Sequence, residues 1–426
     1  MTPNSVNKTL DELLAAARRD NSVSGRDYNS LTTRSTGNSP VVELVNQLIE
    51  QAVDQKASDI HIEPGQETGQ IRYRVDGSLT VVGIPIPLSL YPNIISRLKI
   101  MARLNIAENR LPQDGRFSYD YAGQELDVRV SVVPLINGEK AVLRLLNRAS
   151  RFMDIDSLDL SPVNKRRFIQ LCCQPSGAVI MAGPVNSGKT TALYGALQYL
   201  NSSEKNIIAI EDPVEYRLKG INQLQINPKI QLDFAEALKA VLRQDYDILA
   251  IGEIRTGEVA DMLVRASLAG HLVLATIHTG EAAKVIYRLL DMGIKPYLLG
   301  ISLKGIVAQR LLPRLCPDCC VTYSVEADSP IAQFLGKEFK AGMKLYHRGG
   351  CAKCHNSGIR GRIAVHEILL VDDQLQGCIA ARPTLKELEE GIKASGMLTM
   401  QEDGIAKAIA GWVEIEEIMQ LAAGRW

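Results

Sequence analysis

The chain has 426 residues, of which 46% are hydrophobic, so it is long enough for roughly two to four domains with sizeable cores. Lysine plus arginine equals aspartate plus glutamate, at 48 each, so no net positive charge favours binding to nucleic acid or to an anionic membrane surface. No apolar run approaches the roughly 20 residues that span a bilayer, and the first residues lack the pattern of a signal peptide. These features indicate a cytosolic protein, in which the eight cysteines are not expected to form disulfides.

The first part of the chain is predicted to be a tail followed by a small domain. Residues 1–40 are polar, which is typical of a mobile segment, although Leu10–Arg19 has the pattern of a short helix. Beyond Ser39-Pro40, an N-cap residue followed by proline, apolar residues at helical spacing give way to alternating strand-like runs. We therefore expect an α+β domain over residues 41–148 and a linker over residues 149–160.

Three arginines of this first domain are candidates for binding phosphate. Valines alternate through Asp127–Val133 and share one face of the expected strand, so Arg129 points to the other face. Arg110 and Arg116 lie in the turn-rich segment that precedes this strand. A solvated surface is the ordinary interpretation of such arginines, and a contact with phosphates at a neighbouring domain or subunit is the alternative. The pattern alone leaves both interpretations open.

The segment Gly183–Thr190 has the pattern G-x-x-x-x-G-K-T of a phosphate-binding loop, or P-loop. The run before it, residues 178–182, is apolar and strand-like, and the run after it, residues 189–200, is helix-like. In this context the backbone N–H groups of the loop face phosphates, and the helix N-terminus adds positive potential. Lys189 is expected to reach the β- and γ-phosphates, and the Thr190 hydroxyl to hold Mg²⁺. The predicted nucleotide-binding residues are Gly183, Ser187, Gly188, Lys189, Thr190 and Thr191.

Apolar strand-like runs also lead to Glu211, Glu253 and His278, with helix-like segments between them. This alternation predicts an α/β core over residues 161–315, with a parallel sheet covered on both faces and ligands beyond the carboxyl ends of its strands. We therefore expect these side chains to meet the P-loop. Glu253 is the candidate for orienting and deprotonating the attacking water, or for holding it through Mg²⁺. Glu211 is expected in the Mg²⁺ shell or beside the water, and His278 beside the γ-phosphate.

No arginine stands directly beside the P-loop in the sequence, although phosphoryl transfer benefits from an additional positive charge. An arginine from another domain or subunit would supply that charge. Arg110, Arg116 and Arg129 are therefore counted among the candidate catalytic residues.

Two C-x-x-C pairs follow the predicted sheet. In a cytosolic chain, paired knuckles of this kind indicate a structural, four-thiolate Zn²⁺ site, and redox pairing is the alternative. The site would belong to a module at residues 316–370. The remainder, residues 371–426, has the capping pairs and glycines of a helical region. The expected metal ligands are Cys316, Cys319, Cys351 and Cys354.

From about residue 41 to its end, the chain resembles the secretion ATPase E family, the ATPases of type II secretion and type IV pilus assembly. The resemblance implies a RecA-like P-loop core, a preceding PAS-like α+β domain, a following zinc module, and ATP, Mg²⁺ and Zn²⁺ as cofactors. The motifs that carry it are Ser58–Pro64, Arg72–Gly77, Leu111–Arg116, the P-loop, Ile210–Tyr216, Leu242–Asp245, Ile251–Arg255, Gly270–Thr279 and the four cysteines.

The same resemblance implies roles for particular residues. Glu211 falls in an Asp box, and Glu253 ends an atypical Walker B box. His271 and His278 fall in a His box. The resemblance also implies a homohexameric ring in which arginines of the N-terminal domain reach a neighbour's nucleotide. It further implies a cytoplasmic location at the inner face of the inner membrane, with an inner-membrane platform protein as partner and no nucleic acid.

Three positions depart from the family pattern without removing a reacting group, so ATPase activity is expected. Asn186 replaces a P-loop glycine, Tyr246 replaces a proline, and Thr256 replaces an aspartate. The segment at residues 1–40 is too short for the extra N-terminal domain with which many members dock, which argues against the usual docking partner.

The favoured interpretation is an ATPase motor for pilus assembly or secretion. A retraction-type motor of the same superfamily is one alternative, and the four-cysteine module argues against it. A nucleotide-gated scaffold that binds ATP without hydrolysing it is another, and Lys189 and Glu253 argue against it. A DNA-translocating or conjugation ATPase is the third, and the neutral net charge argues against it.

Overall fold

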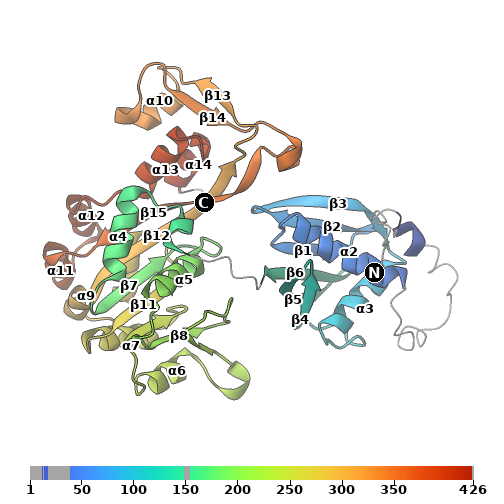
Figure 1. The fold of residues 1–426 in the computed structure, drawn as a ribbon, viewed down its shortest axis with the longest axis horizontal. Helices are drawn as coiled ribbons and strands as arrows, with labels where there is room; N and C mark the ends of the chain where they lie inside the picture. The colour runs from blue at the N-terminus through green and yellow to red at the C-terminus, as the bar shows by residue number, and fades with distance from the viewer. Residues whose placement is uncertain (1–11, 13, 18–38, 148–153, 425–426) are drawn as a thin grey trace. The chain divides into compact units, whose positions relative to one another are not determined.

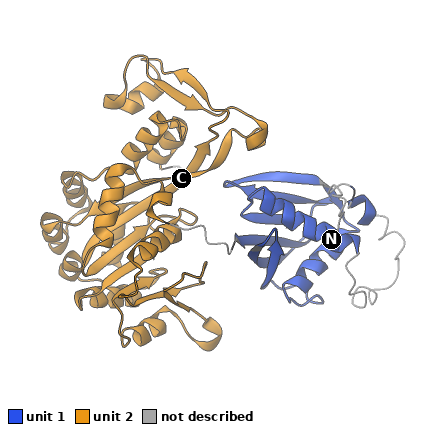
Figure 2. Ribbon diagram, in the orientation of Figure 1, with its two compact units in different colours: residues 1–150 blue, residues 151–426 orange. Residues whose placement is uncertain are grey.

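The structure of the chain, a computed structural model, is shown in Figure 1. Most of the expected tail, and residues 149–153 of the expected linker, lie outside the described residues. The chain divides into two compact units, Met1–Ser150 and Arg151–Trp426, which are described separately (Figure 2). The residues that the structure describes are 12, 14–17, 39–147 and 154–424.

The first unit is built on an antiparallel sheet that has, in its described residues, six strands in the order β3-β2-β1-β6-β5-β4. Helix α2 begins at the proline that follows Ser39, as the N-cap pattern predicts. The elements are α2 (Pro40–Asp54), β1 (Asp59–Glu63), β2 (Thr68–Val75), β3 (Ser78–Pro87), α3 (Tyr91–Met101), β4 (Gln113–Tyr121), β5 (Gln124–Leu135) and β6 (Gly138–Asn147).

One face of this sheet forms an apolar core with α2 and α3. Val128 and Val130 of β5 are buried in it together with Leu44 of α2 and Leu98 of α3. Residues 14–17 are helical, and the side chains of Leu14 and Ala17, at the two ends of this segment, are buried in the same core. Because alternate residues of a strand point to opposite faces, the residues between the valines lie on the face away from the helices.

The second unit contains a sheet with strand order β15-β12-β7-β11-β10-β8-β9, counted over its described residues. Neighbouring strands are parallel, except that β12 and β15 are antiparallel, so the predicted parallel sheet is confirmed. The strands are β7 (Gly177–Ala182), β8 (Ile207–Glu211), β9 (Asn222–Gln225), β10 (Ile248–Ile251), β11 (Leu272–Ile277), β12 (Leu303–Leu315) and β15 (Ile359–Leu370).

Helices cover both faces of this sheet, which is why its central strands β7 and β11 are buried throughout. One face packs against α4 and α5, and the opposite face packs against α6 to α9 (Figure 1). The carboxyl ends of β7, β8, β10 and β11 consequently lie at one edge. The helices are α4 (Pro162–Cys172), α5 (Lys189–Leu200), α6 (Phe234–Val241), α7 (Gly257–Leu268), α8 (Ala282–Asp291) and α9 (Pro296–Ser302).

The rest of the second unit is a small hairpin module followed by four described helices. Helix α11 packs on α9 and α13 packs on β15, so the helical region extends the layers over the sheet. The expected capping boxes are present at Thr384 with Glu387 and at Thr399 with Glu402. Among the described residues, no helix is long and apolar enough to cross a bilayer. The elements are β13 (Val321–Ser324), α10 (Pro330–Leu335), β14 (Lys344–His347), α11 (Asp373–Ala380), α12 (Leu385–Ala394), α13 (Met400–Ile409) and α14 (Ile415–Ala422).

Candidate active site and metal centre

The P-loop connects the carboxyl end of β7 to the first turn of α5, near the centre of the sheet. Gly183 has φ +154°, and a Cβ there would lie 2.6 Å from the carbonyl oxygen of Gln309, so the close approach of β12 requires glycine. Asn186, which replaces the usual glycine, has φ +63°, a left-handed conformation that asparagine tolerates. The departure at this position therefore keeps the loop conformation accessible.

Lys189 begins α5, and its side chain points back into the loop. The Nζ atom donates hydrogen bonds to the carbonyl oxygens of Gly183, at 2.9 Å, and Pro184, at 2.7 Å. It also lies 3.1 Å from Nδ1 of His278, the residue that follows β11. The loop lysine and the histidine at the next strand end are therefore in direct contact.

Further polar contacts extend from this lysine–histidine pair along the edge of the sheet at which the parallel strands end. The Nε2 atom of His278 lies 3.0 Å from Oε1 of Glu253, near the end of β10. The Oε2 atom of Glu253 accepts a hydrogen bond from Nε of Arg255 at 2.7 Å. Arg255 also donates from Nη1 to Asp212, which follows β8, at 3.1 Å. The structure thus brings Lys189, Glu253 and His278 together at the edge where the sequence places them.

The electrostatics of this edge favour an anionic ligand. Burial lowers the pKa of Lys189 to about 8, with the Glu253 carboxylate opposing the shift and the Arg310 cation adding to it. Burial also lowers the pKa of His278, and the Lys189 cation lowers it further. Desolvated cations placed side by side are costly without a counter-charge, and a phosphate group supplies one.

Glu211 ends β8, but its carboxylate turns toward α5. One oxygen accepts a hydrogen bond from the hydroxyl of Tyr194, and the other accepts one from Nε2 of Gln223 at 2.9 Å. Burial raises the pKa of Glu211, while these two hydrogen bonds oppose the shift. Both carboxylate oxygens therefore have protein partners, and a contact between Glu211 and Mg²⁺ or water requires one of these hydrogen bonds to be exchanged or shared.

The two histidines of the expected His box lie at opposite ends of β11. His271 precedes the strand, and its ring packs at a centroid distance of 4.3 Å on Tyr246. His278 follows the strand. Because a strand rises about 3.3 Å per residue, the two histidines are separated by roughly 20 Å along it. His271 therefore lies away from the P-loop of its own subunit, and Tyr246, which replaces the usual proline, packs against it.

Strand β12 lies beside β7 and extends past it along the P-loop. Ala308 pairs with Ala182, the last residue of β7, and Nε2 of Gln309 donates to the carbonyl oxygen of Ser187 at 2.6 Å. Arg310 follows directly, and its charge contributes to the lowered pKa of Lys189. The core therefore does place an arginine close to the P-loop, although none stands beside it in the sequence. Strand order brings Arg310 there, although Gln309 and Ser187 are 122 positions apart in the sequence.

In the first unit, two candidate arginines belong to a row that crosses the sheet on the face away from the helices. Arg116 of β4 is the cross-strand partner of Arg129 of β5, which is the partner of Arg144 of β6. Arg144 pairs in turn with Asp59 of β1, which pairs with Arg74 of β2. Nε of Arg144 lies 3.0 Å from Oδ1 of Asp59. This arginine row places like charges on adjacent strands, with the Asp59 carboxylate beside Arg144.

Arg110 does not belong to the arginine row. It lies in the loop before β4, is largely exposed, and its Nη2 is 2.9 Å from a carboxylate oxygen of Glu108. Arg110, Arg116 and Arg129 belong to the first unit, whereas the P-loop belongs to the second.

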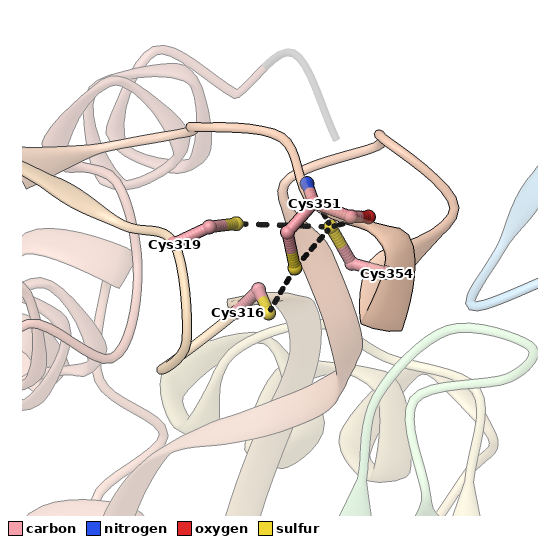
Figure 3. A group of neighbouring side chains, drawn as sticks. All are labelled: Cys316, Cys319, Cys351 and Cys354. Carbon is pink, nitrogen blue, oxygen red and sulfur yellow. Dashed lines mark hydrogen bonds between the residues drawn. The ribbon is translucent and has the colours of Figure 1, made fainter.

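The two cysteine pairs come together in the hairpin module (Figure 3). The four Sγ atoms all lie within 4.8 Å of one another, and the sulfur of Cys354 is 3.6 Å from that of Cys351 and 3.7 Å from that of Cys319. The sulfur of Cys316 is 3.9 Å from that of Cys351. A tetrahedron of thiolates around Zn²⁺ at about 2.3 Å has edges of roughly 3.8 Å. The donor set therefore fits a four-thiolate zinc site.

Backbone N–H groups also favour a thiolate in this cluster. The N–H groups of Cys351 and Gly358 each lie 3.3 Å from Sγ of Cys354. Burial raises the pKa of the Cys354 thiol, but these hydrogen bonds and those from neighbouring thiols outweigh burial and bring it to about 6. Cys320 follows the first pair directly and is not a member of the cluster.

Sequence reasoning assigned no role to Asp212, Arg255 and Arg310. Asp212 directly follows the predicted Glu211, and Arg255 lies two residues after Glu253, so their positions after strand ends were an available signal. No local sequence pattern pointed to Arg310, because it reaches the P-loop only through the pairing of β12 with β7.

Comparisons with known proteins agree with the sequence motifs. The family profile described as "Type II/IV secretion system protein" matches residues 34–420. Type II secretion system protein E of Dickeya dadantii is 45% identical over 385 residues, which are 90% of this chain and 76% of the relative. Type II secretion system ATPase E of Vibrio cholerae is 44% identical over 387 residues, 91% of this chain and 76% of the relative. Type IV pilus assembly ATPase PilB of Thermus thermophilus is 42% identical over 88% of this chain and 42% of the relative.

Solved structures show the same fold at lower identity. The ATPase DotB of Legionella pneumophila aligns with a TM-score of 0.68 at 18% identity, covering 90% of this chain and 96% of the other. The pilus retraction motor PilT with bound ADP aligns with a TM-score of 0.62 at 24% identity, covering 88% and 96%. With the profile match over most of its length and a P-loop in this fold, the chain belongs to the type II/IV secretion system protein family and is a P-loop ATPase.

Proposed function

We propose that the chain is a cytoplasmic, hexameric motor that hydrolyses ATP to power type IV pilus assembly or type II secretion at the inner face of the inner membrane. The observation that carries the proposal is the contact path from Lys189 through His278 to Glu253. This path joins a phosphate-binding lysine to a carboxylate that is able to take a proton from water. Relatives named for type II secretion and for pilus assembly support the choice of process.

In this proposal, different groups of the P-loop bind the phosphates and Mg²⁺. The backbone N–H groups between Gly183 and Gly188, together with Lys189, hold the phosphates. The hydroxyl of Thr190, exposed at the start of α5, joins the Mg²⁺ shell, and Thr191 follows it in the same turn. Bound Mg²⁺ supplies positive charge that offsets the charge of the transferring phosphoryl group.

Glu253 is the proposed base, and its carboxylate is held in place from both sides. His278 contacts one oxygen and Arg255 donates to the other, which fixes the plane of the carboxylate. A water between Glu253 and the terminal phosphate would share one of these carboxylate oxygens, would be oriented for attack and would give its proton to the carboxylate. The Tyr194 hydroxyl holds Glu211 at the end of the neighbouring strand. The Glu211 carboxylate would reach the water or the Mg²⁺ shell only by sharing this hydrogen bond.

The arginine row supports completion of the site by a neighbouring subunit. Arg116, Arg129 and Arg144 present adjacent positive charges on an open face of the first unit. A nucleotide phosphate at that face would accept hydrogen bonds from these guanidinium groups. We therefore propose that these arginines reach the nucleotide of the next subunit in a ring. Arg110 is a weaker candidate, because it lies outside the arginine row, in the loop before β4, where it pairs with Glu108.

The cysteine cluster is proposed to hold one structural Zn²⁺. Four protein thiolates would fill the tetrahedral shell, leaving no position for a substrate. The module is fastened to the last helices by Arg348, which donates to Glu414 at 2.6 Å and to Glu417. Zinc would therefore stabilise a rigid surface beside the helical region, where an inner-membrane platform protein is the proposed partner.

A steady-state phosphate-release assay with Mg-ATP tests the proposed activity. Glu253→Gln is expected to bind ATP but to release phosphate about 100-fold or more slowly, because the amide cannot act as a base. Lys189→Ala is expected to weaken both binding and hydrolysis. Glu258→Gln, the same change at an exposed carboxylate of α7, is the matched control and should leave the rate unchanged. A wild-type rate for Glu253→Gln means that the assigned role of Glu253 is wrong.

The scaffold alternative and the choice of process have separate readouts. Wild-type protein that binds ATP without releasing phosphate would replace the motor with a nucleotide-gated scaffold. In a strain that lacks the chain, loss of surface pili indicates pilus assembly, whereas loss of secreted proteins with intact pili indicates secretion.

A further inference from the structure

The strand beside the P-loop carries a charged side chain that the proposed mechanism does not use. Residues Gly305 to Ala308 of β12 pair with β7 up to its last residue, so Gln309 and Arg310 run beside the first part of the P-loop. The side chain of Gln309 holds the loop through the Ser187 carbonyl. Arg310, as the next residue of the strand, projects from the opposite face of β12.

The guanidinium group of Arg310 is partly buried, and two of its nitrogens lack an acceptor within the part of the chain that the structure describes. Its Nε and Nη1 atoms are buried and have no hydrogen-bond partner among the described residues. Two carboxylates, Glu281 and Glu367, act on its charge without a hydrogen bond to it. Each has a partner of its own, because Glu281 is 2.7 Å from Nζ of Lys284 and Glu367 accepts from the N–H of Ala282 at 2.7 Å. Desolvating a cation without a partner is costly, so the arrangement points to an acceptor from outside the chain.

The position of the guanidinium tells where that acceptor would lie. A Cβ added at Gly280 would lie 2.4 Å from Nη2 of Arg310, so the guanidinium fills the space beside the turn that follows His278. It is also near enough to Lys189 for its charge to act on the lysine. The guanidinium therefore lies beside the turn that follows His278, and its charge reaches Lys189. His278 and Lys189 are the residues beside which the mechanism places the terminal phosphate.

We propose that Arg310 binds the terminal phosphate of ATP in its own subunit, donating hydrogen bonds from its guanidinium to the phosphate oxygens. This inference rests on the proposed ATPase function and adds an arginine in cis to the arginines that are proposed to act in trans. A guanidinium that meets only the terminal phosphate gives the site a preference for ATP over ADP, because ADP leaves its donors unpaired.

The ratio of ATP affinity to ADP affinity tests the proposal. Binding is measured for full-length protein carrying Glu253→Gln, so that ATP is not consumed, with Mg-ATP and Mg-ADP as ligands. Adding Arg310→Gln is expected to weaken ATP binding by about tenfold or more and ADP binding by less than about twofold. With Arg310→Lys, the ATP affinity is expected to lie between those measured with arginine and with glutamine, because lysine keeps the charge but loses the planar fork of the guanidinium.

Arg314→Gln is the matched control. Arg314 lies four residues further along the same strand, where its guanidinium packs over the ring of Trp412. The same substitution at this position removes an arginine from β12 but should leave the ATP to ADP ratio unchanged. A change in ratio at both positions would indicate a general effect on the strand and would overturn the proposal.

Gly280→Ala gives a second test that leaves the charge in place. The added Cβ displaces the guanidinium, so ATP affinity should fall selectively, as it does for Arg310→Gln. The two changes should not add when they are combined, because both act on one contact. An unchanged ATP to ADP ratio in Arg310→Gln and in Gly280→Ala would overturn the proposal, as would an equal loss of both nucleotides. Either result leaves the ATPase function intact, whereas wild-type protein that binds neither nucleotide would refute that function itself.

Discussion

The Nε2 atom of His278 lies 3.0 Å from Oε1 of Glu253, while the other ring nitrogen of the same histidine contacts the P-loop lysine. One imidazole therefore couples the residue that binds phosphate to the residue that is proposed to activate water. The ring spans the gap because β11 lies next to both β7 and β10 in the sheet.

The first prediction follows from this contact. His278→Ala should lower kcat about 100-fold, because Glu253 loses one of the two groups that orient it and a small misplacement of a catalytic group is costly. The Kd for ATP should change much less, since the P-loop backbone remains. Phosphate release and equilibrium binding measure the two effects. His347→Ala, at an exposed histidine of β14, is the control. A large loss of ATP affinity with unchanged kcat would contradict the coupling role.

The second prediction concerns the support of Glu211. Tyr194→Phe removes the hydroxyl that donates to its buried carboxylate, so we expect a loss of roughly 1–3 kcal/mol in the free energy of unfolding. Tyr199→Phe makes the same change on the same helix at an exposed ring and should cost little. Urea denaturation of both variants provides the comparison. Equal stabilities would show that the Tyr194 hydroxyl does not support Glu211.

The third prediction concerns the metal. Freshly purified, reduced protein should contain about one zinc per chain, with a shell of sulfur at about 2.3 Å by X-ray absorption. Cys319→Ser should lower both the zinc content and the soluble yield, because the module depends on the metal. Cys320→Ser changes the adjacent cysteine, which lies outside the cluster, and should retain zinc. Absence of zinc from the reduced wild-type protein would rule the site out.

The fourth prediction is a pH dependence in the first unit. Two nitrogens of Arg72 donate to Glu63 at 2.7 and 2.8 Å, and together with Lys140 they lower the pKa of Glu63 to about 2. A lowered carboxylate pKa stabilises the folded state above the unfolded pKa of about 4.5, and this stabilisation is lost as pH falls toward 2. Glu63→Gln should therefore destabilise β1 and β2 at neutral pH and have less effect at about pH 3.

Hydrogen exchange of the β1 and β2 amides in the full chain measures this difference. Glu67→Gln, at an exposed carboxylate just before β2, is the control and should show no such pH dependence. An effect of Glu63→Gln that is the same at both pH values would mean that the ion pair contributes nothing to local stability.

The sequence predicted those parts of the site that local patterns determine. The P-loop has a fixed spacing, and the two cysteine pairs carry their ligands within short knuckles, so neither depends on the order of the strands. Glu253 and His278 were placed together because parallel strands end at a common edge. The capping boxes near Thr384 and Thr399 are equally local.

Features that depend on which strands become neighbours were not predictable in this way. Arg310 reaches the P-loop because β12 inserts beside β7, and a single sequence does not specify that choice. The turn of Glu211 toward Tyr194 depends on how α5 packs over the sheet. The addition of Arg144 to the arginine row depends on the register of β5 with β6, in which Arg129 faces Arg144.

The last prediction concerns the ring and the arginine row. If the row completes a neighbour's site, Arg129→Ala and Arg144→Ala should each bind nucleotide but hydrolyse it poorly. Lys189→Ala should be defective in its own P-loop while its arginines remain intact. A mixture of Arg129→Ala with Lys189→Ala then contains interfaces at which an intact P-loop meets an intact arginine row.

The measurement is the ATPase rate against mixing ratio after subunit exchange. At equal mixing, random assembly into a ring gives roughly a quarter of interfaces with both halves intact, so activity should rise well above that of either variant. Mixing Arg129→Ala with Arg144→Ala is the matched control, because both changes damage the same half of the interface and no mixed interface is repaired. Activity that never exceeds the average of the two separate variants in the first mixture would mean that the arginines act within their own subunit or only in folding.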